Sequence, residues 1–119
     1  MSRGLRNNNP GNIRRSRVRY KGEVHPSRDP EFKEFSSMAY GYRAMFVLLD
    51  TYQRRYSLCT IRQMLNRYAP PSENFTEGYI RFVSQRSGIL PDETIDSRSQ
   101  RDMIAIVAAM SEIENGVVA

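Results

Sequence analysis

The strongest constraint on the fold is a helical repeat of apolar residues that starts near residue 38 and continues almost to the end of the chain. Over residues 38–56, apolar side chains recur at intervals of three or four, so they share one face of a helix: Met45, Leu48, Leu49, Tyr52 and Tyr56. Thr60 and Gln63 have the spacing of a capping box, which opens a second helix that Pro70-Pro71 ends. Because the first apolar stripe is the longest, its helix is expected to be long and central.

Two further helices follow from start and stop signals. Asn74 with Glu77 indicates the start of the third helix, and Gly88 suits the position just after its last turn. Residues 89–98 are expected to form a loop. Ser99 can cap the last helix, which is predicted to run to about Glu114 with Gly116 just beyond it.

The first 37 residues have a different pattern. The run from Asn7 to Asn12 is dense in turn-forming residues. Partial alternation of apolar side chains between Ile13 and Val24 indicates short strands, with Lys21-Gly22 as the turn of a hairpin. Phe32–Phe35 is expected to be a third short strand. The chain is therefore predicted to be one mainly α (α+β) domain, with a turn-rich basic arm and hairpin over residues 1–37 and a helical core over 38–119.

The positive charge is concentrated at the N-terminus. Residues 1–21 contain seven of the 18 basic residues and no acidic residue, so the rest of the chain has a net charge of −2 although the whole chain has +5. Such an arm would attract phosphate, anionic lipid or anionic wall polymers. Sixteen of the 18 bases are arginine, which favours planar recognition of carboxylate or phosphate. The alternative is a solvated basic edge without a partner.

Several classes of protein and site are not expected. Cys59 is the only cysteine, so no disulfide can form within the chain, and His25 is the only histidine. Neither a metal site nor a nucleotide-binding glycine motif is expected, and no cofactor is predicted. No apolar run has the roughly 20 residues that span a bilayer, and no signal peptide is visible. We therefore expect synthesis in the cytoplasm and no membrane insertion, with a virion or other machinery carrying the protein to any target outside.

The last predicted helix contains a carboxylate on its apolar face. At about 100° per residue from Met103, Val107 and Glu114 fall on one stripe, whereas Glu112 falls on the opposite side. Partial burial raises the pKa of a carboxyl group, and the C-terminal end of a helix dipole acts in the same direction. Glu114 is therefore a candidate general acid for glycosidic cleavage. The alternative is that Glu114 lies at a frayed helix end and turns into solvent.

Motifs along nearly the whole chain resemble those of phage virion structural proteins. The most specific is the run Arg6-Asn7-Asn8-Asn9-Pro10-Gly11-Asn12-Ile13-Arg14. The similarity continues through Phe32-Lys33-Glu34-Phe35, Gly41-Tyr42-Arg43-Ala44, Tyr68-Ala69-Pro70-Pro71 with Glu73-Asn74, and Glu114-Asn115-Gly116. This resemblance implies a location in the virion but no chemistry.

A second resemblance implies chemistry. Bacterial glucosaminidases and lytic transglycosylases of the lysozyme superfamily have a Glu-Ser-Gly helix end, an Asn-rich loop, a Phe-x-x-Tyr-x-Ser segment and a Tyr-Ala element followed by Tyr. Similar pieces here are Glu114-Asn115-Gly116, Asn9–Ile13, Phe32–Ser37, and Tyr68-Ala69 with Tyr79. Asn115 and Phe35 depart from the pattern. The pieces have the usual order only if the tail is joined to the head, which implies a circularly permuted lysozyme-like domain.

The resemblance assigns roles to particular residues. Glu114 is the catalytic acid, Tyr68 and Tyr79 line a sugar cleft, and Asn12 bonds an N-acetyl group. Both tyrosines can instead be core-edge aromatics, and turn formation alone can explain Asn12. If a second carboxylate is used, the hairpin region should supply it, and we favour Glu23 over the other candidates, Asp29, Glu31 and Glu34. Glu23 can instead be a surface charge beside the turn.

The function implied is cleavage or binding of the β-1,4 glycan strand of peptidoglycan, by hydrolysis or by transglycosylation. The alternative is a non-enzymatic virion component whose basic arm holds DNA or a neighbouring subunit. Permutation adds a geometric expectation: Glu114 and Asn12 should share one wall of one cleft, with Glu112 pointing away. The chain ends should lie close together, because the seven residues Val117–Ala119 and Met1–Gly4 span at most about 25 Å.

Overall fold

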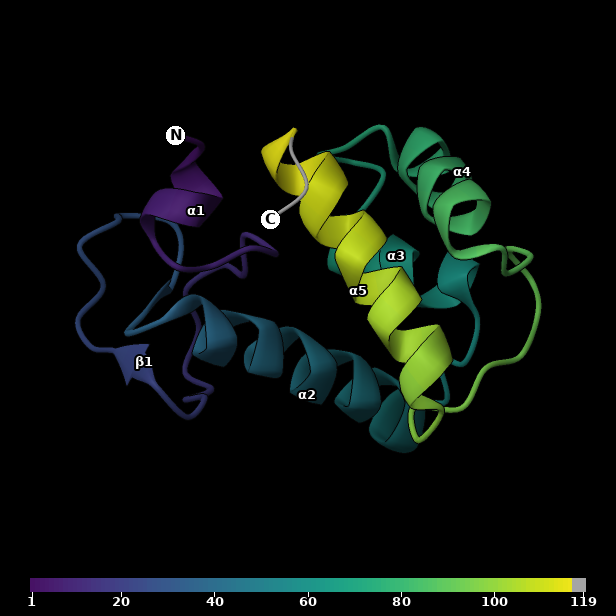
Figure 1. The fold of residues 1–119 in the computed structure, drawn as a ribbon, viewed down its shortest axis with the longest axis horizontal. Helices are drawn as coiled ribbons and strands as arrows, with labels where there is room; N and C mark the ends of the chain where they lie inside the picture. The colour runs from purple at the N-terminus through teal and green to yellow at the C-terminus, as the bar shows by residue number, and fades with distance from the viewer. Residues whose placement is uncertain (117–119) are drawn as a thin grey trace.

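The computed structural model describes residues 1–116, and Val117–Ala119 lie outside the described part (Figure 1). The elements are α1 (Arg3–Arg6), β1 (Glu23–Val24), β2 (Glu34–Phe35), α2 (Met38–Tyr56), α3 (Ile61–Tyr68), α4 (Thr76–Ser87) and α5 (Gln100–Asn115). The predicted fold class, mainly helical with a small hairpin, is confirmed. Within residues 1–116, no helix is both long enough and apolar enough to cross a membrane.

The helix ends largely follow the predicted signals. Thr60 Oγ1 accepts a bond of 3.1 Å from Gln63 N, while Gln63 Oε1 accepts from Cys59 N rather than from the cap residue itself. Gly88 and Gly116 take left-handed backbone angles and end α4 and α5. The start of α4 differs from the prediction, because its cap is Phe75 and the Asn74 side chain donates to Pro70 O instead.

The core lies among the four long helices. Figure 1 shows α5 crossing the molecule between α2 on one side and α4 on the other. Met45 and Leu49 of α2 and Ile106 and Met110 of α5 have 1% exposure or less. The prediction that residues 38–56 form a long helix is confirmed, since α2 has 19 residues, but the central position belongs to α5, which packs against α1, α2 and α4.

The predicted hairpin is wrong in its pairing. Lys21-Gly22 does form a turn, but β1 follows that turn and pairs antiparallel with β2, with Glu23 opposite Phe35. An isolated bridge also pairs Arg14 with Phe32. The helix α1 was not predicted; the Ser2 side chain caps it by accepting from Leu5 N at 3.2 Å.

The Asn-rich run attaches the N-terminus to the helices. Asn9 is fully buried, and its amide bonds Ile13 N, Ile13 O and Lys33 O. At the other end of the chain, Asn115 Nδ2 donates to Pro10 O, and Ser2 Oγ donates to Asn115 Oδ1 at 2.7 Å. The two ends of the described chain therefore lie side by side, as expected.

Candidate functional site

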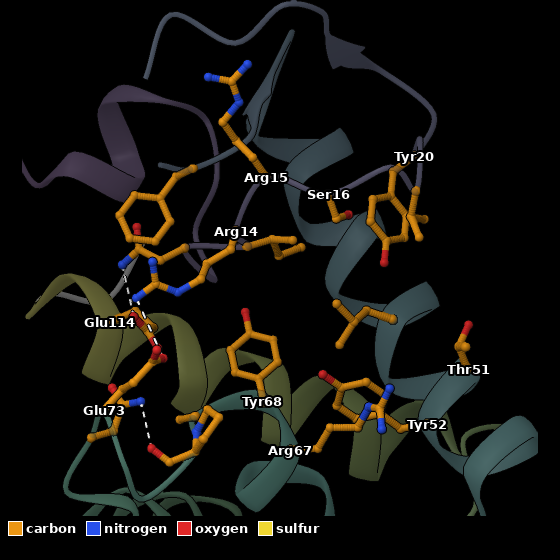
Figure 2. Close-up of a pocket in the computed structure, with 18 of the residues that line it drawn as sticks. Arg14, Arg15, Ser16, Tyr20, Thr51, Tyr52, Arg67, Tyr68, Glu73 and Glu114 are labelled. Carbon is orange, nitrogen blue, oxygen red and sulfur yellow. Dashed lines mark hydrogen bonds and ion pairs between the residues drawn. The ribbon is translucent and has the colours of Figure 1, made fainter. Parts of the chain in front are cut away.

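A groove of about 510 Å³ lies between the N-terminal segment and the helices (Figure 2). One wall comes from residues 12–20, and the opposite side comes from α2, from the end of α3 and from the connection to α4. The last turn of α5 contributes Glu114. Tyrosine and arginine are prominent among the lining residues: Tyr20, Tyr52, Tyr56 and Tyr68, with Arg14, Arg15 and Arg67.

Both carboxylate oxygens of Glu114 are hydrogen-bonded inside this groove. Asn12 Nδ2 donates to Oε1 at 2.9 Å, and the Tyr79 hydroxyl donates to Oε2 at 2.9 Å. Burial raises the pKa of Glu114 above its ordinary value, while Asn12, Tyr79 and Arg14 act against that rise. The result is a partly exposed carboxyl group with a raised pKa and a fixed orientation.

Three elements set this geometry. Helical periodicity places Glu114 toward the groove, while Glu112 is not among the groove residues and pairs with Arg86 on α4 at 2.8 Å. Asn12 reaches Glu114 from a left-handed backbone position with φ of 49°, a conformation that asparagine adopts more readily than most residues. Tyr79 comes from the buried face of α4 and is 7% exposed.

The two predicted cleft tyrosines have different positions. Tyr68 lines the groove, and its hydroxyl donates to Gly11 O, which ties α3 to the Asn-rich turn. Tyr79 is not among the groove residues and contacts Glu114 from the protein interior. Burial raises the pKa of both phenols well above the ordinary value, so each remains a neutral donor.

Glu23, the expected second carboxylate, is outside the groove lining. Its side chain is 6% exposed and accepts from Lys33 Nζ at 3.0 Å. Lys33 is 1% exposed and also donates to Val18 O at 2.7 Å. This arrangement gives Glu23 a structural partner in place of the expected catalytic position, because a buried lysine needs a carboxylate beside it.

Glu73 is the carboxylate that shares the groove with Glu114. It lies in the α3–α4 connection, is exposed, and comes within 4.0 Å of Arg14 Nη2. In the sequence, Glu73 stands out only as part of a motif. No periodicity marks a residue in such a loop, so the motif containing Glu73-Asn74 was the sole signal available.

The arrangement suits proton transfer to a ligand lying in an open, aromatic-lined groove. Within residues 1–116, no cluster of three or more His, Cys, Asp or Glu side chains is placed to hold a metal ion. The chemistry available in the groove is that of two carboxyl groups, phenol hydroxyls and guanidinium groups.

The basic arm is folded against acids of the hairpin region. Arg3 donates two hydrogen bonds to the Asp29 carboxylate, at 2.6 and 2.7 Å. Arg14 lies 3.5 Å from Glu31, and Arg19 lies 3.6 Å from Glu23. Part of the local charge excess is therefore compensated within the protein.

Comparison with known proteins gives one informative match. The chain is 38% identical over 118 residues to "Protein P5" of Pseudoalteromonas phage PM2, which covers 97% of this chain and 72% of that protein. No model of a protein family matches the chain.

Proposed function

The chain belongs to the family of Protein P5 of Pseudoalteromonas phage PM2, and we propose that it is a virion-associated protein that cleaves the glycan strand of peptidoglycan. The observation that carries the proposal is Glu114, a carboxyl group of raised pKa held by Asn12 and Tyr79 inside a groove. A groove site open to a polymer and lined by tyrosines suits an extended sugar chain.

In the proposed reaction the protonated Glu114 carboxyl donates its proton to the glycosidic oxygen as the bond from that oxygen to the anomeric carbon breaks. The anomeric carbon then takes either a water oxygen or an internal hydroxyl oxygen of the sugar, and the proton of that group passes to the Glu114 carboxylate left by the first step, or to Glu73 where that residue acts as the base. We assign the second carboxylate role, where one is used, to Glu73, because it lines the same groove. Asn12 and Tyr79 act as positioning residues that hold the acid in place.

The test uses two glutamates of one helix. Glu114→Gln should reduce release of dye from labelled peptidoglycan by at least about 100-fold, the lower end of what a general acid contributes. Glu112→Gln is the matched control, since Glu112 lies two positions earlier and pairs with Arg86 away from the groove. Equal activity in wild type and Glu114→Gln would overturn the proposal. So would absence of release by the wild type across pH 4–8 on several types of wall.

A second candidate function is a non-enzymatic virion component, which is supported by membership of a phage protein family. Its arm would hold DNA or a neighbouring subunit through basic residues that have no acidic partner within residues 1–116, such as Arg6, Arg17 and Lys21. Binding to several phosphates would make affinity for duplex DNA fall steeply with salt. A flat salt dependence, or no mobility shift, would exclude the DNA form of this candidate.

A further inference from the structure

We propose that Arg67, with Tyr52 and Tyr56, forms a subsite for a carboxylate of the substrate at the end of the groove away from Glu114. On a peptidoglycan strand, that carboxylate would belong to the peptide stem attached to alternate sugars. This inference rests on the proposed function and specifies the substrate further: a glycan that carries acidic peptide stems, rather than a bare one.

The first support is the setting of the Arg67 guanidinium. Its central carbon lies 4.0 Å from the centre of the Tyr56 ring and 5.4 Å from that of the Tyr52 ring. Two rings that pack on a guanidinium restrict its orientation, and the Tyr52 hydroxyl also interacts with Arg67. Such a group is prepared for a planar anion, because less side-chain freedom is lost on binding.

The second support is that Arg67 has no acidic partner within the part of the chain that the structure describes. Of the other two arginines of the groove, Arg14 has acidic partners, and Arg15 has none within residues 1–116 but bonds a backbone carbonyl and points elsewhere. Arg14 lies 3.5 Å from Glu31 and 4.0 Å from Glu73. Arg15 donates to Asp29 O, and Figure 2 shows it directed away from Tyr68 and Glu114. Arg67 is therefore the cation that the groove offers to a ligand.

The third support is position. In Figure 2, Tyr68 lies between Glu114 and the pair formed by Arg67 and Tyr52, and all four residues line the same groove. A chain lying over Tyr68 would thus meet the acid at one end and the cation at the other. Burial raises the pKa of the Tyr52 phenol to about 12, so its hydroxyl remains a donor beside Arg67 at neutral pH.

The distribution of charge favours a glycan with separate carboxylates over a polyanion. Glu73 lies at the opposite end of the groove from Arg67 and would repel a phosphate there, so a backbone that carries a phosphate at every unit fits the groove poorly. A neutral sugar chain with an acidic substituent can place sugars beside Glu114 and a carboxylate beside Arg67. The ligand class that fits is therefore a neutral glycan with acidic branches.

The test compares two forms of one substrate: labelled peptidoglycan with its stems, and the same glycan after an amidase has removed the stems and the lactyl carboxylates freed by that hydrolysis have been capped as methyl amides. Arg67→Gln should lose about 10-fold to 100-fold in activity on the first, the range expected for hydrogen bonds to a charged group, and less than twofold on the second. Arg67→Lys should recover part of the loss. Arg101→Gln is the control, since Arg101 on α5 is 97% exposed and is not among the groove residues.

The outcomes separate this inference from the proposed function. A wild type inactive on both substrates overturns the proposed function. If the wild type is active, either of two results overturns the carboxylate subsite. Arg67→Gln could lose no activity on either substrate, or it could lose activity by the same factor on both. A second measurement uses the slow variant Glu114→Gln: it should bind a stem-bearing disaccharide more tightly than the same disaccharide with its lactyl group capped as the methyl amide, and adding Arg67→Gln should remove the difference. Persistence of that difference would overturn the subsite as well.

Discussion

Asn12 Nδ2 donates a hydrogen bond of 2.9 Å to Glu114 Oε1, across 102 positions of sequence. The other atom of the same amide, Asn12 Oδ1, is buried and has no hydrogen-bond partner within residues 1–116. An unsatisfied buried acceptor costs about 1–3 kcal/mol. The Asn12 amide is thus held toward Glu114 at an energetic cost, which favours a positioning role over the N-acetyl contact expected from sequence.

The first prediction concerns the pH dependence of glycan cleavage. Tyr79→Phe removes a hydrogen bond that stabilises the charged form of Glu114 and lowers its pKa. Without that bond the pKa of Glu114 rises further. Because a general acid works only while protonated, the limb on which activity falls with rising pH should move to higher pH.

The measurement is the pH–rate profile of kcat/KM. Tyr40→Phe is the control, since Tyr40 lies on α2 and is not among the groove residues. Asn12→Gly, which retains the left-handed backbone but removes the amide, should shift the limb in the same direction. An unchanged limb in both variants would show that Glu114 does not set it.

The position of Glu114 was predictable because helical periodicity is local. Met103, Val107 and Glu114 share a stripe whatever the rest of the chain does, and Gly116 marks the helix end by its backbone freedom alone. The strand pairing was not predictable in this way. Glu23 follows a turn in either arrangement, but its partner across the sheet is Phe35 of β2, and no local pattern identifies a partner that lies beyond the next loop.

The residues around the acid show the same division. Asn12 and Tyr68 could be predicted as site residues from their motifs, and both line the groove. Arg67 carried no local signal, because an exposed arginine on a helix is an ordinary surface residue, and Glu73 was marked only by its motif. Their place in the same groove as Glu114 depends on how α3 and its connection to α4 pack against the N-terminal segment.

The second prediction concerns stability. A carboxyl group whose pKa is raised in the folded state holds its proton more tightly there than in the unfolded chain. Glu114 therefore leaves the protein most stable below its ordinary pKa of 4.5 and destabilises it progressively as pH rises toward its folded pKa. Glu114→Gln has no such group. Its free energy of unfolding should therefore rise relative to that of wild type over this interval, and the difference between the two should be constant at higher pH.

Urea unfolding at a series of pH values measures this difference. Subtracting the two proteins cancels groups common to both, including Asp29, whose pKa is lowered mainly by its hydrogen bonds from Arg3. Asp29 has the opposite pH dependence, because the stability that its lowered pKa contributes is lost as pH falls. If the free energy of unfolding of Glu114→Gln fell relative to that of wild type as pH rises, the result would contradict a raised pKa for Glu114.

The third prediction separates Glu23 from Glu73. Lys33→Met leaves the Glu23 carboxylate buried without its main partner, which should cost about 3–5 kcal/mol in unfolding free energy. Combining Lys33→Met with Glu23→Gln should cost less than the sum of the single changes, because neither charge remains buried alone. Additive costs in this double-mutant cycle would show that the pair is not coupled.

The same variants distinguish structural from catalytic carboxylates. Glu23→Gln should lower the melting temperature but keep the activity per folded molecule, since Glu23 lies outside the groove lining. Glu73→Gln should leave the melting temperature nearly unchanged, because Glu73 is exposed, and should lower activity if water is the attacking group. The reverse pattern would return the second carboxylate role to Glu23.

The last prediction concerns the order of elements. The hydrogen bond between Ser2 and Asn115 places the first residues beside the end of α5, so a short linker can join them. A circular permutant opened between Asp92 and Glu93, two exposed residues of the α4–α5 loop, would place α5 ahead of the Asn-rich turn. That order of motifs is the one that the proposed relationship to glucosaminidases and transglycosylases predicts.

The permutant should fold with one cooperative transition and retain cleavage within about tenfold of wild type, because the new opening cuts no helix and leaves the bond from Asn12 to Glu114 intact. A control opened between Leu48 and Leu49 interrupts α2 inside the core and should not fold, since Leu49 is fully buried. Both proteins contain the same residues and linker, so only the position of the opening differs. Failure of the loop permutant to fold, measured by circular dichroism and thermal melting, would show that the covalent order of α5 and the N-terminal turn matters, and would contradict a permuted relationship.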